Sequence, residues 1–245
     1  MDQPVKAAPV QSIRNRLLEL LPADDVELLR PHLKSVAFTY KLPLYQAFEP
    51  LEFVYFPVTG VASLVNTMAD GSASEVGTIG NEGMIGLPVI LGDTVAPTSV
   101  YIQVPGQGLR LPVKVLRDGL DSSRTMRTVM DHYAHAFFNQ VAQSAACNHF
   151  HSLEQRSCRW LLMTHDRVHS AQFMLTHEFL AMMLGVRRSS VTVAANRLKR
   201  LNLIKYNRGH VTILDRKGLE TRTCECYAVS KCEFDRLLGP PSGPA

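Results

Sequence analysis

The sequence predicts an α+β protein in which an antiparallel, strand-rich half precedes a long helix and a mostly helical C-terminal half. Three observations predict this order. Short alternating apolar runs separated by Gly and Pro fill residues 36–115, which is typical of antiparallel strands. Gly and Pro are then absent from 120 to 150, where apolar residues recur at helical spacing. Finally, helical spacing returns from about 152 to 168 and again after a hairpin-like segment near 203–214, which predicts the mostly helical second half.

Composition excludes several classes of protein. The chain has 245 residues, of which 46% are hydrophobic and 20% charged, as in ordinary globular domains rather than disordered, collagenous or coiled-coil chains. No apolar run approaches the roughly 18 residues that cross a bilayer, and the first residues lack the pattern of a secretory signal. The five cysteines are odd in number and unevenly spaced, which favours a reducing compartment over a disulfide framework. We therefore expect a cytoplasmic protein without a membrane partner.

The net charge of +4 is divided unequally along the chain. Residues 1–148 hold 11 Lys and Arg against 14 Asp and Glu, whereas residues 149–245 hold 15 against 8. Between 187 and 208 basic residues recur without a single acid. Such a division indicates a polyanionic partner for the second half. The alternative is a solvated basic surface that binds nothing.

The first half opens with helical sequence over 12–29, which Pro22 splits into two short helices. Strands then follow at intervals of about 8–12 residues, with turn sequences such as 69–72, 80–83 and 105–108 between them. This pattern predicts a compact antiparallel barrel or sandwich.

The long helix is predicted to begin near Asp118 or Asp121 and to end at Phe150. At 1.5 Å per residue it is about 42 Å long, too long for a small barrel to cover. A seam between two copies of the chain is the natural cover, and packing within one domain is the alternative. The residues assigned to the dimer seam are Met126, Met130, Tyr133, Phe137 and Val141.

The most informative segment is 175–215, where the spacing predicts a helix–turn–helix followed by a β-hairpin. Thr176 can cap the first helix, and Gly185 suits the sharp turn between the helices. Ser189 or Ser190 can begin the second helix. Its inward face is then Val191, Ala194, Ala195 and Leu198.

The outward face of the second helix carries side chains that can recognise bases. Arginine forms hydrogen bonds with guanine, asparagine with adenine, and serine or threonine with either base. Basic residues farther along the helix are expected to contact phosphate. The hairpin from 203 to 214 adds a wing with a basic tip. The predicted DNA-binding residues are Thr176, Arg187, Arg188, Ser189, Ser190, Thr192, Asn196, Lys199 and Arg208.

This order of parts resembles the Crp/Fnr family of bacterial transcription regulators, most closely over 175–215. The resemblance implies a cyclic-nucleotide-binding-like β-roll over 12–117, a dimerisation helix over 118–150 and a winged helix–turn–helix domain over 151–238. It further implies a homodimer that binds palindromic promoter sites on double-stranded DNA and contacts RNA polymerase. The implied function is sequence-specific transcriptional regulation and not catalysis.

The sequence departs from that family at its sensing positions. Where cyclic-nucleotide-binding members carry Gly-Glu and Arg-Ser pairs, this chain has Gly86-Leu87 and Thr98-Ser99. A cyclic phosphate would lack its arginine partner, which argues against cyclic AMP as the signal. The first cysteine is Cys147, so the N-terminal iron–sulfur cluster of the oxygen-sensing branch is not expected either. The sequence does not identify the signal that the roll senses. The alternative is that the roll senses no signal and serves only as a scaffold for dimerisation and polymerase contact.

A second hypothesis is a metal- or thiol-dependent protein that uses C-terminal cysteines and histidines. Cys224, Cys226 and Cys232 could supply three thiolates, with His149 and His151, or His165 and His169, nearby. Against it, the Cys-x-x-Cys spacing is absent and a helix would point residues 224 and 226 apart. We therefore expect no metal, no cofactor and structural cysteines.

Overall fold

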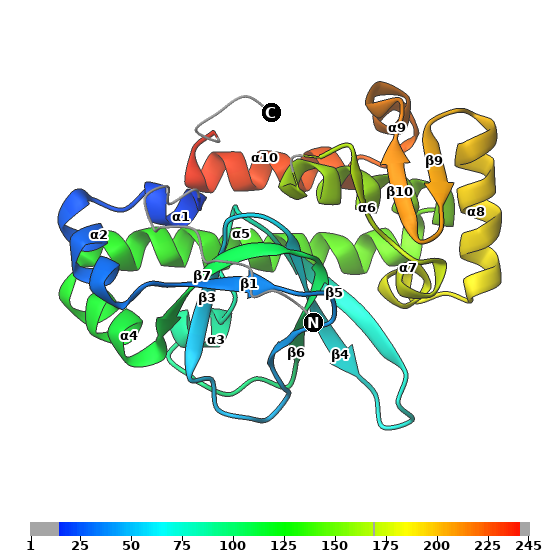
Figure 1. Ribbon diagram of the computed structural model, residues 1–245. Coiled ribbons are helices and arrows are strands. Elements are labelled where there is room, and N and C mark those ends of the chain that lie inside the picture. Colours follow the sequence, from blue (N-terminus) through cyan, green and yellow to red (C-terminus); the bar gives the residue numbers. More distant parts are fainter. Residues whose placement is uncertain (1–14, 169, 241–245) are drawn as a thin grey trace, which may run out of the picture.

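The computed structural model describes residues 15–168 and 170–240. The helix α5 (Arg124–Phe150) runs through the middle of the molecule, with a β-roll along one side and α10 (Cys226–Leu238) along another (Figure 1). The remaining C-terminal elements gather at one end of α5. The predicted α+β order is confirmed.

The roll consists of two antiparallel sheets, β1-β7-β3 and β2-β6-β4-β5. Apolar residues of both sheets meet in one core, which also includes residues of α5. The seven strands are β1 (Lys34–Phe38), β2 (Pro43–Tyr45), β3 (Phe53–Pro57), β4 (Val61–Thr67), β5 (Ala73–Ile79), β6 (Ser99–Val104) and β7 (Gly106–Pro112).

Short helices flank the roll, and one of the predicted helix boundaries differs. Pro22 does separate two helices, although 12–14 lie outside the described residues. The long helix begins at Arg124 and not near Asp118 or Asp121, because Ser123 caps it by accepting the Met126 N–H at 3.1 Å. The flanking helices are α1 (Arg16–Glu19), α2 (Ala23–Leu29), η1 (Arg30–His32), α3 (Leu87–Ile90) and α4 (Val113–Ser122).

The apolar stripe predicted as a dimer seam faces the roll of the same chain. Met126, Met130, Tyr133 and Phe137 are at most 2% exposed, and Val141 is half-buried against the same core. The Tyr133 hydroxyl donates to the Met84 carbonyl at 2.8 Å. A Cβ at position 83 would overlap the Tyr133 ring, so a glycine is required there for this approach. The seam assignment was therefore wrong for Met126, Met130, Tyr133 and Phe137, whereas for the half-buried Val141 it stays a prediction.

The exposed face of α5 is a different stripe, at steps of three and four residues. Phe138 is 68% exposed, next to the buried Phe137. We call this face the α5 stripe, and it consists of Asp131, His135, Phe138, Ala142, Ala145 and His149.

The C-terminal elements form most of a second core, which also includes Val61 and Val104 of the roll. A three-stranded sheet, β8-β10-β9, packs beside the helices. These elements are α6 (Leu153–Val168), β8 (Gln172–Met174), α7 (His177–Leu184), α8 (Arg188–Arg200), β9 (Ile204–Asn207), β10 (His210–Ile213) and α9 (Arg216–Arg222). Among the described residues, no helix is both long enough and apolar enough to span a membrane.

Candidate nucleic-acid interface

The turn between α7 and α8 is built from local capping interactions. The Thr176 hydroxyl accepts the Phe179 N–H at 3.1 Å and so caps α7. Gly185 ends α7 with φ at 61°, a left-handed conformation that glycine adopts without steric cost. Its N–H bonds the carbonyls of Ala181 and Met182. The predicted cap and turn are therefore present at these two positions.

The second helix, α8, begins slightly earlier than predicted. Arg187 occupies the N-cap position and Arg188 is the first helical residue, ahead of Ser189 and Ser190. The predicted inward face is buried, as the exposures of its members are at most 7%. These members are Val191, Ala194, Ala195 and Leu198. With this face held in the domain core, the opposite face of α8 is free.

Most of the predicted reading side chains lie on that free face. Arg187, Arg188, Ser189, Asn196 and Lys199 are exposed, whereas Ser190 and Thr192 are half-buried. Val193, between the polar positions, is 68% exposed. An exposed valine among polar residues on a helix suits contact with a thymine methyl.

Thr192 has partners within the domain. Its hydroxyl donates to the Arg188 carbonyl at 3.1 Å and lies 3.0 Å from His177 Nδ1. Burial, with Arg188 and Lys199 nearby, lowers the pKa of His177 below its ordinary value. His177 is thus favoured as a neutral ring that holds Thr192 in place at the surface.

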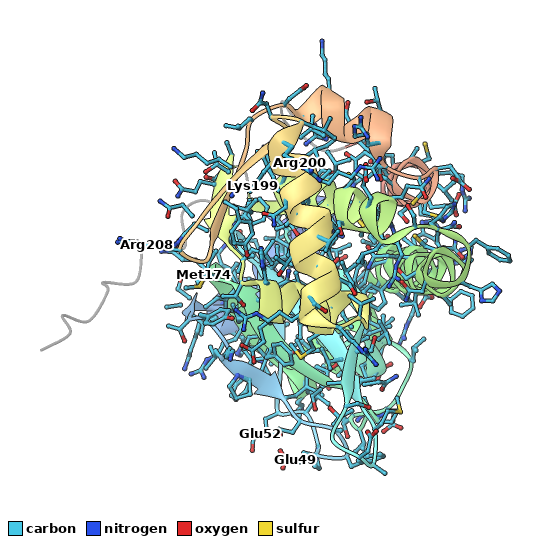
Figure 2. All side chains as sticks on the ribbon, turned by 90° about the vertical axis from the view of Figure 1, so that its right-hand side faces the viewer. Glu49, Glu52, Met174, Lys199, Arg200 and Arg208 are labelled. Carbon is cyan, nitrogen blue, oxygen red and sulfur yellow. The ribbon has the colours of Figure 1, made fainter. Side chains whose placement is uncertain are left out.

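The wing is the tight hairpin of β9 and β10. Asn207 pairs with His210, so Arg208 and Gly209 form a two-residue loop, and both have positive φ. This is the geometry of a type I′ turn. Arg208 projects from the tip, to the left of α8 in Figure 2, and the upper end of α8 carries Lys199 and Arg200. Glu49 and Glu52 lie at the lower edge of the molecule in this view, away from these cations.

The interface also includes one ion-paired group that the sequence did not predict. Glu154 of α6 lies 2.8 Å from Arg197 Nε and 3.0 Å from Arg222 Nη1. Arg197 is one of the basic residues farther along α8 that were expected to contact phosphate, and this ion pair holds it toward α6. The spacing of these three residues gives no signal in the sequence, because they belong to three different helices.

The helix α7 packs against the roll. The Tyr101 hydroxyl lies 3.4 Å from Met182 Sδ, and the Tyr101 and Phe179 rings meet edge to face. The Ser63 hydroxyl is 3.4 Å from Met183 Sδ. The two halves of the chain thus share apolar contacts, while α8 is on the side away from the roll (Figure 1).

The residues at the sensing positions lie on the roll. Gly86 has φ at 116° and precedes Leu87, the first residue of α3. A Cβ on Gly86 would lie 2.6 Å from Val54 Cγ1. Ser99, which begins β6, accepts the Ala47 N–H at 3.0 Å, and Thr98 is half-buried beside it. No charged side chain occurs among these four positions.

The predicted grouping of Cys224, Cys226 and Cys232 is not formed. Cys232 is exposed, whereas the other two are buried with Cys147. The segment is not one continuous helix, because Thr223 is extended and α10 begins only at Cys226. His149 packs on Phe150, His165 contacts Arg216, and residue 169 lies outside the described residues.

The C-terminal half matches a known family of DNA-binding domains. Residues 155–222 match the family model of the Crp-like helix-turn-helix domain. A comparison with curated proteins finds no match.

Similar folds occur among solved structures. A protein from Eubacterium rectale described under the Crp/Fnr family of transcriptional regulators has 18% identity and a TM-score of 0.63, covering 84% of this chain and 96% of its own. FixK2 from Bradyrhizobium japonicum has 12% identity and a TM-score of 0.62, with 78% and 98% covered. A CRP-family regulator from Thermus thermophilus has 20% identity and a TM-score of 0.62, with 76% and 95% covered.

These matches confirm the resemblance drawn from the sequence. None of the three structures is named as an enzyme. The chain therefore carries a Crp-like helix-turn-helix domain on the fold of the Crp/Fnr transcriptional regulators.

Proposed function

We propose that the protein is a sequence-specific transcriptional regulator that inserts α8 into the major groove of double-stranded DNA. The observation that carries this proposal is the free face of α8. Arg188, Ser189 and Asn196 are exposed there, while the opposite face is buried in its own domain. These side-chain types can bond base edges.

The flanking cations support the same docking. Lys199 lies toward one end of α8, and Arg208 lies at the wing tip (Figure 2). Both side chains are exposed, whereas Arg197 is held by a carboxylate of α6. Both can neutralise phosphates on either side of the helix. We assign phosphate contact to Lys199 and Arg208 and base reading to Arg187, Arg188, Ser189, Ser190, Thr192 and Asn196. Thr176 adds a contact beside the wing.

We further propose that the regulator is a homodimer joined through the α5 stripe. Phe138 and the small Ala142 and Ala145 give the stripe an apolar centre at coiled-coil spacing. A two-fold axis through this helix would present two copies of α8 to a palindromic site, with half-sites about 34 Å apart. Contact with RNA polymerase belongs to the same proposal.

The signal is proposed to differ from cyclic AMP. The roll offers Leu87 and Thr98 where the resemblance places an acid and an arginine. A buried phosphate without a guanidinium loses its charge-assisted hydrogen bonds. We therefore expect cyclic AMP to leave DNA affinity unchanged.

The test is selection of an operator from random duplexes by the full-length protein, followed by footprinting on the selected site. An inverted repeat protected by one dimer is the expected result. Failure to enrich any sequence, with binding of all duplexes alike at low salt, would contradict sequence-specific regulation. Enrichment of a single half-site bound by monomers would contradict the proposed homodimer but not sequence-specific DNA binding.

A further inference from the structure

Three cysteines and a histidine from distant parts of the chain meet at one place. Cys147 lies in the last turn of α5, and His151 is the residue that caps it. Cys224 precedes α10, and Cys226 begins it. Cys147 and Cys224 are 77 residues apart in sequence. The sulfur of each cysteine and a ring nitrogen of His151 all lie within 4.8 Å of one another.

We propose that Cys147, His151, Cys224 and Cys226 bind one Zn²⁺ ion in tetrahedral coordination. The Cys147 and Cys224 sulfurs are 3.5 Å apart, and Cys226 Sγ is 3.4 Å from His151 Nδ1. With metal bonds of about 2.3 Å to sulfur and about 2.0 Å to nitrogen, a tetrahedral ion separates such atoms by about 3.8 and about 3.5 Å. These two separations need to lengthen by only a few tenths of an ångström to admit the ion, and the remaining donor pairs already lie within 4.8 Å of one another.

The short separations favour a single ion over an iron–sulfur cluster. In a cluster the four ligands are divided among two or four irons, so ligand atoms on different irons are more widely spaced than these. Three thiolates and one imidazole form a ligand set that is typical of structural zinc sites. The donors are soft, so Mg²⁺ and Ca²⁺, which prefer oxygen, do not suit the site.

Groups around the four ligands support the same assignment. Glu225 Oε1 lies 3.2 Å from His151 Nε2, on the side of the ring opposite the sulfurs. A proton on Nε2 satisfies this contact and leaves the Nδ1 lone pair free for the metal. Carboxylates commonly orient metal-binding histidines in this way. The Gln143 amide donates to Cys226 Sγ at 3.0 Å, a bond that stabilises a thiolate.

Burial and charge also suit a bound ion. The three cysteines are at most 3% exposed, whereas Cys232 is exposed. Three thiolates around one divalent cation leave a net negative charge, which is costly in a buried site without compensation. Arg156 and Arg159 of α6 both interact electrostatically with Cys147, and they can compensate it.

The proposed ligands come from two segments of the chain, the junction of α5 with α6 and the start of α10. The chain leaves α5 at His151 and enters α6 at Leu153, and it returns to α5 through α10. A metal ion held by both segments would fix the DNA-binding elements against the end of the long helix. The metal-binding claim does not depend on the proposed function, whereas any effect of the metal on DNA affinity does.

The first experiment titrates the reduced, chelator-stripped, full-length protein with Zn²⁺ and separately with Co²⁺. The expected result is one ion per chain, with the intense visible bands of tetrahedral Co²⁺ and a thiolate charge-transfer band. Cys147→Ser and His151→Gln should abolish this stoichiometry, whereas the neighbouring controls Cys232→Ser and His149→Gln should preserve it. Glu225→Gln should weaken Zn²⁺ binding by about 10- to 100-fold.

A second experiment needs no variant and so does not depend on mutants folding. Cysteine alkylation of the wild-type chain is followed by mass spectrometry with and without Zn²⁺. Zn²⁺ should protect Cys147, Cys224 and Cys226 and leave the rate at Cys232 unchanged. The proposal is overturned if reduced protein takes up no Zn²⁺, or if Zn²⁺ does not slow alkylation of these three residues. Zinc uptake without an effect on operator binding would leave the site standing and would separate it from the proposed function.

Discussion

Arg167 of α6 and Glu82 of the roll form a buried ion pair, with Nη2 and Oε1 2.8 Å apart and side-chain exposures of 8% and 14%. Arg167 also donates to the Gln140 amide oxygen of α5 at 3.0 Å. One guanidinium thus contacts the roll, the long helix and the C-terminal half. A Cβ on Gly80 would lie 2.6 Å from the Arg167 stem, so this glycine makes room for it.

Replacing Arg167 with leucine should destabilise the protein strongly. The substitution leaves the Glu82 carboxylate buried without its cation, and breaking a buried pair in this way costs about 3–5 kcal/mol. The measurement is the free energy of unfolding in urea. Lys114→Ala, which breaks an exposed pair with Asp118, is the control and should shift the midpoint little. Equal losses of unfolding free energy from the two substitutions would show that the buried ion pair stabilises the fold no more than the exposed one.

A double variant refines this test. Arg167→Leu combined with Glu82→Leu removes both charges, so no uncompensated carboxylate is left. We expect the double variant to be more stable than Arg167→Leu alone. Additive losses would instead mean that the two residues do not interact energetically.

Glu75 makes the stability of the fold depend on pH. Burial raises the pKa of Glu75 to about 8, although hydrogen bonds from Ser63 and Trp160 and the charges of Arg167 and Arg159 act in the opposite direction. In the unfolded chain the same carboxyl has its ordinary pKa of 4.5. Between these values the folded state holds a proton that the unfolded state has released. Stability from this group is therefore lost as pH rises through the window, and it is constant above about pH 8.

The check is Glu75→Gln, whose amide cannot ionise. Unfolding free energies of both proteins are compared from about pH 5 to about pH 9, where the slope from one group is at most about 1.4 kcal/mol per pH unit. The variant should gain stability relative to wild type as pH rises. A difference that stays constant with pH would mean that Glu75 keeps an ordinary pKa.

The helix–turn–helix could be predicted from sequence because its determinants are local. Thr176 caps the helix that follows it by accepting the N–H of Phe179, three residues along the chain, and Gly185 makes its turn through its own backbone. The inward face of α8 follows from spacing within a single helix. Each of these features depends on residues that are neighbours along the chain.

The face of α5 and the cysteine site could not be predicted in the same way. The periodicity of Tyr133 and Phe137 shows that they are buried but does not show whether the roll or a second chain covers them. The roll covers them because Gly77 and Gly83 leave space for their rings. Cys147 and Cys224 are brought together only when α10 folds back along α5, and the spacing of Cys224 and Cys226 misleads when a helix is assumed across both.

Phe138→Glu should separate the proposed dimer without unfolding the protein. Phe138 is 68% exposed in the single chain, so a charge there costs the monomer little, whereas a charge inside an apolar seam is costly. Sedimentation velocity measures the mass. Thr125→Glu, exposed in the first turn of the same helix but outside the α5 stripe, is the matched control. A Phe138→Glu protein that sediments as an intact dimer would exclude the α5 stripe as the seam.

Arg188 and Lys199 should have different effects on DNA binding, because one is assigned to bases and the other to phosphate. Arg188→Ala should weaken binding to the selected operator by about 1–3 kcal/mol and relax the choice of base at one position. Lys199→Ala should weaken binding to the operator and to a scrambled duplex alike and reduce the dependence of affinity on salt. Fluorescence anisotropy at several salt concentrations measures both effects. Lys114→Ala removes the same charge from α4, at the opposite end of the molecule (Figure 1), and should change neither. If Arg188→Ala lowers affinity for both duplexes equally, Arg188 contacts phosphate, and the reading face of α8 must be reassigned around Asn196.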